Sequence, residues 1–148
     1  MSQPIAPPVG HPAPHRHRVA IPAQLAGLAV GPFAWAIQLE VGYALTSYAC
    51  HPGQIELSAL APGWGWTRPA GLVVNLIALL VCLAAGALTL RAWRATRDEA
   101  AGPPRHLIEA GEGRTRFLAA CGALTSFGFA FAIAFDTVMI LGAPACRA

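Results

Sequence analysis

The residues of this chain that could do chemistry are four cysteines and two acids, all within or beside long apolar stretches. Paired thiols can form a structural disulfide, exchange electrons, or hold a soft metal such as Cu(I). Catalytic dithiols usually have a Cys-x-x-Cys spacing, and this sequence has no such pair. The spacing therefore favours structural thiols over a redox centre.

Two of the cysteines, Cys82 and Cys121, lie inside apolar stretches. Cys82 is nine residues before Arg91 and Cys121 is five residues after Arg116. With a helical rise of 1.5 Å per residue, we expect the two thiols within about 6 Å of each other in depth, where they could touch or hold a metal. We favour two small buried side chains, because bare thiolates are costly in lipid.

The two acids are Glu40 and Asp136, and Gln38 and Asn75 add amides to the same kind of surroundings. An acid in the middle of a membrane costs several kcal/mol against lipid, so both should face protein or water. They could move a proton or cation, or they could hold helices together and dock a partner. We favour polar packing, because no second acid stands one turn away to form a relay. Gln38, on another side of its helix from Glu40, could contact a partner.

Several kinds of site are missing from the sequence. No histidine lies inside an apolar stretch, so this chain alone cannot hold haem between paired histidines. Phosphate-binding glycine loops, nucleophile elbows and zinc-protease helices are also absent. The sequence predicts no enzyme activity, no cofactor and no metal.

The elements that must position these residues are transmembrane helices. Apolar residues make up 55% of the 148 residues and charged residues 11%, against about 25% charged in a typical soluble domain. Three stretches, at about 19–48, 70–90 and 117–141, reach the about 20 residues that span a bilayer. We expect an all-α integral membrane protein, with a disordered Pro/His-rich tail at 1–18 and connections at 50–69 and 91–116. Gly31-Pro32 suggests a kink or a tilted first segment.

The direction of insertion follows from the basic residues, all ten of which are arginines. Eight lie in the tail and the second connection, and two, Arg68 and Arg147, lie on the other side. The positive-inside rule then places the N-terminus in the cytoplasm and the C-terminus in the periplasm. The arginines thus mark a membrane face, and we expect no nucleic-acid partner. Cys50 and Cys146 fall together in the oxidising compartment, so we predict a Cys50–Cys146 disulfide.

Small and polar residues repeat along one side of each span, as expected where helices pack closely in lipid. The three series are Gly27, Gly31, Ala34, Gln38 and Gly42; Gly71, Asn75, Ala78, Cys82, Ala85 and Thr89; and Cys121, Thr125, Gly128, Ala132 and Asp136. We expect antiparallel packing of the second and third series to bring Cys82 to Cys121 and Asn75 to Asp136.

Three segments carry a resemblance to a known group: Gly31-Pro32-Phe33-Ala34-Trp35 through Gly42-Tyr43-Ala44-Leu45 to Cys50, Arg116-Phe117-Leu118-Ala119, and Pro144-Ala145-Cys146. The chain resembles small three-helix proteins of the bacterial inner membrane whose genes lie beside those of haem–copper respiratory oxidases. The resemblance implies a respiratory neighbourhood and outer-face cysteines at both helix ends. It assigns no activity and no functional residue.

Three functions remain open from the sequence. The favoured one is a non-catalytic accessory or assembly subunit of a respiratory membrane complex, in contact with lipid and with other membrane subunits or itself. The alternative is a small homo-oligomeric proton, cation or metal transporter that uses Glu40 and Asp136. A membrane thiol redox protein is the third, and it would need exchange between the two cysteine pairs.

Overall fold

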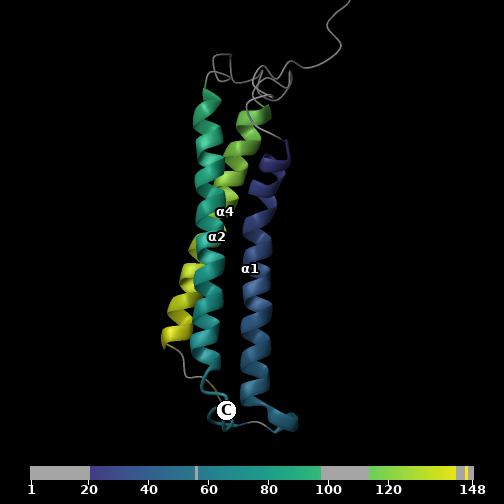
Figure 1. Ribbon diagram of the computed structural model, residues 1–148, viewed down its shortest axis with the longest axis vertical. Coiled ribbons are helices and arrows are strands. Elements are labelled where there is room, and N and C mark those ends of the chain that lie inside the picture. The colour runs from purple at the N-terminus through teal and green to yellow at the C-terminus, as the bar shows by residue number, and fades with distance from the viewer. Residues whose placement is uncertain (1–20, 56, 98–113, 143–145, 147–148) are drawn as a thin grey trace, which may run out of the picture.

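The computed structural model describes residues 21–55, 57–97, 114–142 and Cys146, which form a bundle of three long α-helices (Figure 1). They are α1 (Ile21–Cys50), α2 (Thr67–Ala95) and α4 (Arg114–Gly142), and a short 3₁₀ turn, Pro52–Gln54, follows α1. All three are long and apolar enough to cross a membrane, which confirms the all-helical, three-span fold class. The predicted tail at 1–18 lies outside the described residues.

α2 and α4 are longer than the spans predicted from the apolar stretches, whereas α1 has the predicted length and lies two residues further along the chain. α2 begins at Thr67 rather than Ala70 and continues to Ala95, and α4 begins at Arg114. At 1.5 Å per residue, 29 residues reach about 44 Å, close to the thickness of a bilayer with its headgroups. Apolar stretches mark only the hydrocarbon core, whereas the helices continue through the headgroup level. The predicted connections at 50–69 and 91–116 lie between hydrocarbon spans, and the helix ends extend into both of them.

The surface of the bundle is that of a protein solvated by lipid. Large apolar side chains point outward from every helix, for example Tyr43, Leu124 and Phe131, which are 74%, 75% and 77% exposed. Exposure of this extent over all three helices would be costly in water at about 25 cal/mol per Å². The molecule is therefore a multi-pass membrane protein. We call its two ends the arginine end, with Arg91, Arg94 and Arg116, and the disulfide end, with Cys50 and Cys146.

α1 runs through Pro32 as one continuous helix. Proline has no N–H to donate to the carbonyl four residues earlier, so it usually bends a helix. The first turns of α1 lean away from the straight remainder (Figure 1). Both sequence interpretations, a kink and a tilted first segment, describe this shape.

Glycines bring the helices together in the half of the bundle near the arginine end. A Cβ atom on Gly27 of α1 would lie 2.1 Å from the Thr89 methyl carbon of α2. A Cβ atom on Gly31 would lie 3.2 Å from the Cα atom of Ser126 in α4. The Ser126 hydroxyl donates a 3.0 Å hydrogen bond to the Gly27 carbonyl. Small residues thus allow backbone contact that lipid itself does not drive.

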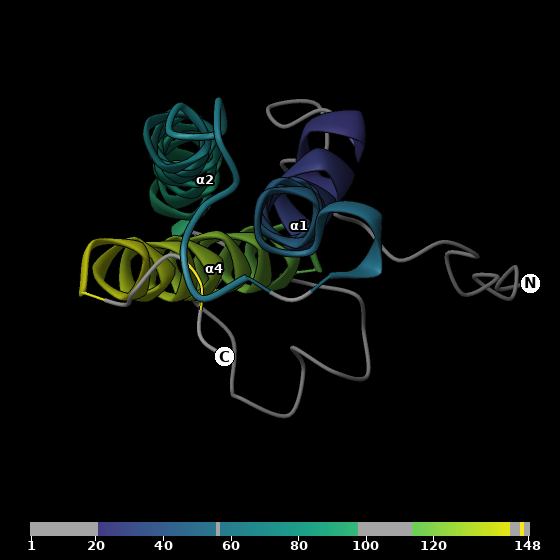
Figure 2. The ribbon, with the colours of Figure 1, turned by 90° about the horizontal axis from the view of Figure 1, so that it is seen from below.

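The sequence predicted the packed side of α2 correctly but not that of α4. Asn75, Ala78, Cys82 and Thr89 are buried along α2, as expected. Along α4 the buried residues are Thr115, Ala119, Gly122, Ala123, Ser126, Ala130 and Ile133, whereas Gly128 is exposed. The packed side is rotated because α4 lies across both other helices (Figure 2). The packed side of α4 must therefore contact both α1 and α2. Its small residues Gly122 and Ser126 allow these contacts.

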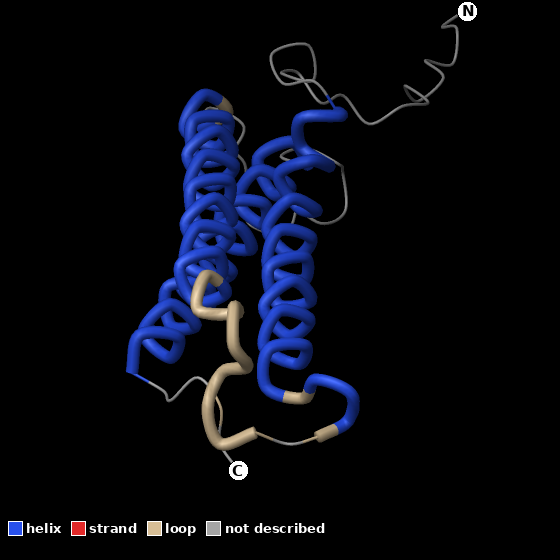
Figure 3. The backbone as a smooth tube through the Cα atoms, turned by 60° about the horizontal axis from the view of Figure 1, so that its bottom comes forward, coloured by secondary structure: helices blue, strands red, loops and turns tan. Residues whose placement is uncertain are grey.

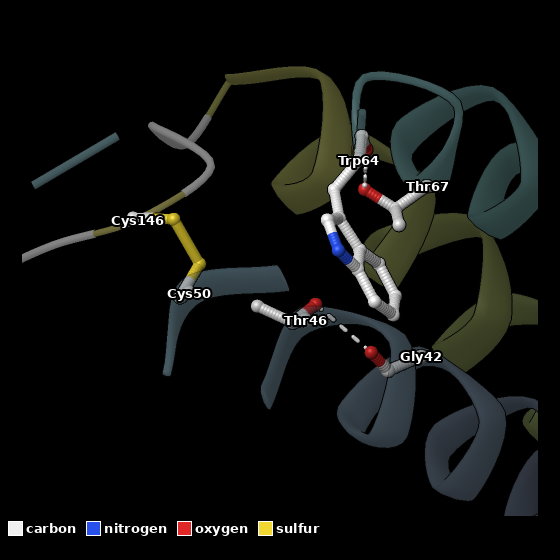
Figure 4. Close-up of a disulfide and its surroundings, with 6 residues drawn as sticks. All are labelled: Gly42, Thr46, Cys50, Trp64, Thr67 and Cys146. Atoms are coloured by element: carbon white, nitrogen blue, oxygen red, sulfur yellow. Dashed lines mark hydrogen bonds between the residues drawn. A yellow bond between two sulfur atoms is a disulfide. The ribbon is translucent and has the colours of Figure 1, made fainter. Parts of the chain in front are cut away.

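The connection after α1 closes the disulfide end. The Leu57 N–H donates to the Cys50 carbonyl and the Ala61 N–H to the Ala49 carbonyl, each at 3.0 Å. These bonds satisfy carbonyls that the end of a helix leaves open. The connection then runs across this end to α2 (Figure 3). In Figure 4 the Trp64 ring points from the connection toward Thr46 and Gly42 of α1.

Candidate functional site

One polar residue from each helix lies at the same depth, and we call Gln38, Asn75 and Asp136 the polar layer. Gln38 Nε2 donates a 2.8 Å hydrogen bond to Asp136 Oδ2. Ala78 of α2 and Ile133 of α4 belong to one packed cluster. Asn75 and Asp136 each lie three residues, about one turn, from these residues toward the disulfide end, so they share a level.

Two expectations for these residues need revision. Gln38, considered for contact with a partner, is buried and donates to Asp136 of its own chain. Asn75 was expected beside Asp136, and the two share a depth without a hydrogen bond between them. The longer Gln38 side chain reaches Asp136 across the space between α1 and α4, and it thereby provides a donor for the half-buried carboxyl.

Asn75 is the least satisfied polar side chain of the described structure. It is 1% exposed, and neither its Nδ2 nor its Oδ1 atom has a hydrogen-bond partner. An orphaned buried polar group costs roughly 1–3 kcal/mol. Its side chain leans toward the N-terminus of α2 and hence toward Gly71, one turn nearer the disulfide end.

A cavity of about 400 Å³ lies on the disulfide side of the polar layer. Besides the Tyr43 hydroxyl, its polar lining comes from five side chains: Gln38, Thr46, Thr67, Arg68 and Asp136. The Thr46 and Thr67 hydroxyls donate to the Gly42 and Trp64 carbonyls, each at 2.9 Å (Figure 4). The Arg68 guanidinium donates to the Leu141 carbonyl at the end of α4. The groups are thus engaged within the chain rather than aimed at one point.

Tightly packed apolar residues separate the cavity from the arginine end. Directly beyond the polar layer, Ala78, Cys82, Ala130 and Ile133 form the buried core. Trp35 and Phe129 pack against this core with their ring centroids 5.4 Å apart. A route from Asp136 to the arginine end through one protomer would have to cross this core.

Glu40 lies on the opposite side of α1 from the cavity. It is exposed, whereas Gln38, two residues earlier, is buried. Two residues correspond to about 200° around a helix, so the two side chains point in nearly opposite directions. Within the described part of the chain, no hydrogen bond or ion pair reaches the Glu40 carboxyl. Of the two surroundings expected for Glu40, protein or water, this protomer does not supply protein.

The cysteines separate into one bonded pair and two distant thiols. Cys50 and Cys146 form a disulfide with their Cα atoms 5.6 Å apart, as predicted. Cys82 packs with Ala130 and Ile133, and its thiol lies 3.9 Å from the Gly31 carbonyl oxygen. Gly122, next to Cys121, lies against Thr89, seven residues from Cys82 on α2. Seven residues span about 10 Å, so the expected Cys82–Cys121 proximity is wrong.

The described residues also bear on whether a group of side chains could bind a metal ion. Among residues 21–55, 57–97, 114–142 and Cys146, no three His, Cys, Asp or Glu side chains could hold a metal ion together. Sequence reasoning missed the cavity and the Arg68–Leu141 bond. Both arise where α4 diverges from α1, and the order of residues carries no signal for that divergence.

The fold and site define a three-helix membrane protein with a disulfide at one end and a glycine-packed core toward the other. No family model matches the chain, and no curated protein or solved structure is similar to it.

Proposed function

We propose that this protein is a non-catalytic accessory or assembly subunit of a bacterial respiratory membrane complex of the haem–copper oxidase type. The observation that carries the proposal is the exposed Glu40 carboxyl on α1. An isolated protomer leaves this group against lipid, and a subunit in a larger complex does not.

The depth of Glu40 in the membrane makes exposure of its carboxyl to lipid costly. Glu40 lies ten residues before the end of α1 at Cys50, which is about 15 Å along the helix. Because the helix ends reach the headgroup level, the carboxyl lies inside the hydrocarbon layer, on the disulfide side of its centre. A charged side chain costs about 2.5–3.5 kcal/mol at the centre of a transmembrane helix on insertion scales, which is the upper limit at this depth. Such residues usually face protein or water and mark a functional contact.

The internal structure suits a scaffold. The disulfide ties α1 to the segment after α4 over a separation of 96 residues. Gly27, Gly31 and Gly122 hold the other half in backbone contact. A rigid bundle with one unsatisfied outward face is what docking requires, because little conformational freedom is lost on binding.

The respiratory partner and the membrane are inferred from the sequence. The resemblance to small proteins encoded beside haem–copper oxidases suggests the complex and the bacterial inner membrane. The positive-inside distribution of the arginines supports a cytoplasmic location for the arginine end. There the Arg116 guanidinium lies 4.7 Å from the centroid of the Trp93 ring, an arrangement suited to the headgroup level.

A homo-oligomeric transporter is the second candidate, supported by Asp136 in the cavity. Its weakness is geometric, because Glu40 and Asp136 lie on different sides of α1 and the apolar core bounds the cavity. A thiol redox function is less favoured still, since exchange would have to cross from the disulfide end to Cys82 and Cys121.

The test is the composition of the native complex. Membranes solubilised in a mild detergent are separated by native electrophoresis, and the band containing this chain is examined by haem absorbance and mass spectrometry. We expect the chain to migrate with haem-bearing subunits in a fixed ratio. Recovery only as a monomer or as a pure homo-oligomer would contradict the proposal.

A further inference from the structure

We infer that the Glu40 side of α1 docks onto a transmembrane helix of a different polypeptide that carries an arginine or lysine at the same depth. The inference rests on the proposed accessory function and specifies the chemistry of the partner. We call the exposed residues Phe33, Ile37, Glu40 and Ala44 the docking face.

The docking face is continuous and lies apart from the contacts inside the bundle. Its residues follow one another at intervals of four, three and four, so they share one side of the helix. Phe33 and Ile37 are 66% and 61% exposed. Ala36 and Ala44, four residues before and after Glu40, are exposed and small. A helix can therefore approach the carboxyl closely.

A second copy of this chain is a poor occupant of that face. Copies inserted in one direction present the same residues at the same depth. Near the polar layer, the exposed side chains of α2 and α4 are apolar: Val73, Leu76, Ile77, Phe135 and Val138. Thr137 is half-buried, and its hydroxyl donates 2.9 Å to the Ile133 carbonyl.

A homodimer in which the two α1 helices face each other also fails to satisfy Glu40. Around a two-fold axis along the membrane normal, the group at the depth of Glu40 on the facing α1 would be another Glu40. Two carboxyls can share one proton, but two like charges repel each other in a medium of low dielectric constant. An α1–α1 pair therefore offers the Glu40 carboxyl no basic group, and the large exposed side chains of α2 and α4 near this depth offer none either.

Charge complementarity points to a basic partner. Lipid tails offer neither a donor nor a counter-charge, and acidic and basic residues inside membranes pair with each other. A guanidinium or ammonium group supplies several N–H donors together with the opposite charge. The acidic and the basic side chain would then each gain a partner. Their ion pair would also fix the rotation and the depth of one helix relative to the other.

The test uses the full-length protein in lipid nanodiscs and two synthetic probes. One probe is an oligoleucine transmembrane helix with a single central lysine, and the other has leucine in its place; both carry a fluorophore for energy transfer. We expect the lysine helix to bind the wild-type protein at least about tenfold more tightly. Glu40→Gln should reduce this preference to less than about threefold. Equal binding of the two helices to the wild type would overturn the inference.

A relocated acid is the matched control. Glu40→Leu combined with Val73→Glu moves the carboxyl to an exposed position of α2 at a similar depth. We expect the preference for lysine to remain lost, because the small flanking residues of α1 are absent there. Full recovery would show attraction to any lipid-facing acid and would overturn the assignment of the face. Circular dichroism and the Cys50–Cys146 disulfide on a non-reducing gel verify the fold of each variant.

The native complex separates this inference from the proposed function. If the wild-type chain migrates with haem-bearing subunits, Glu40→Leu should release it. Retention of Glu40→Leu in that complex overturns the inference and leaves the accessory function standing. Failure of the wild-type chain to migrate with them contradicts the accessory function, and the probe helices still decide whether the face selects a basic residue.

Discussion

At the scale of single residues, one hydrogen bond spans the place where α1 and α4 separate. Gln38 and Asp136 are 98 positions apart in sequence and 2.8 Å apart between Nε2 and Oδ2. In a bilayer the unfolded reference state also finds partners, so such bonds contribute about 0.6 kcal/mol on average and up to about 1.7.

This bond can be measured by a double-mutant cycle of Gln38→Leu and Asp136→Leu. We expect a coupling energy of about 0.6–1.7 kcal/mol for unfolding in mixed micelles. Thr46→Val is the control in the same cavity, because its hydroxyl donates to Gly42 of its own helix. That control should change stability by less than about 0.5 kcal/mol. A coupling energy of zero would mean that the two side chains act independently.

Asn75 presents the opposite case, a buried amide without a partner. Leucine has a similar shape and no hydrogen-bonding group that needs a partner. Asn75→Leu should therefore leave stability unchanged or raise it by about 1 kcal/mol. Ser126→Ala is the comparison, because that buried hydroxyl does have a partner, the Gly27 carbonyl, and should lose about 0.6 kcal/mol. A clear loss in Asn75→Leu would show that water or a ligand occupies the amide.

At the scale of elements, the sequence predicted the helices well and their faces unevenly. Three apolar stretches predict three spans because lipid requires every backbone group to be bonded within a helix. The packed side of α2 followed from its small residues, since Asn75 and Cys82 are both buried. α4 has small residues on more than one side, so spacing alone could not choose among them. The error over Cys121 has this origin.

The same reasoning explains what the sequence could not give for the candidate site. Gln38, Asn75 and Asp136 were each singled out by polarity, and all three lie in the polar layer. Which of them form a hydrogen bond depends on the tilt of α4, and that tilt is determined by many small packing contacts together. The cavity depends on that tilt too. The outward direction of Glu40 follows from its position two residues after the buried Gln38.

Close packing of the helices can be tested with two glycines of α1. Gly27→Ala should destabilise the bundle by about 1–3 kcal/mol, the range for overpacking. The added methyl would overlap the Thr89 methyl, which cannot turn aside easily because the Thr89 hydroxyl donates to the Ala85 and Gly86 carbonyls. Gly42→Ala meets nothing within 4 Å, so higher helix propensity should stabilise it by about 0.5–1 kcal/mol. Equal effects in the unfolding titration would contradict this packing.

At the scale of the whole molecule, the disulfide and the arginines make one prediction about topology. Disulfides persist in oxidising compartments and arginine-rich connections stay in the cytoplasm. The bundle places Cys50 and Cys146 at the end opposite Arg91, Arg94 and Arg116. Two unrelated physical effects therefore agree on the direction of insertion.

Fusions to reporters that work on one side of the membrane test this direction. Alkaline phosphatase, which needs its own disulfides, should be active when fused after Ala148 and inactive when fused after Arg97. A green fluorescent protein should fluoresce in the reverse pattern. In a strain that cannot form periplasmic disulfides, the Cys50–Cys146 bond should be lost while insertion stays the same, because arginine placement sets the direction. Phosphatase activity after Arg97, or a Cys50–Cys146 bond that persists in that strain, would break the agreement between the two effects.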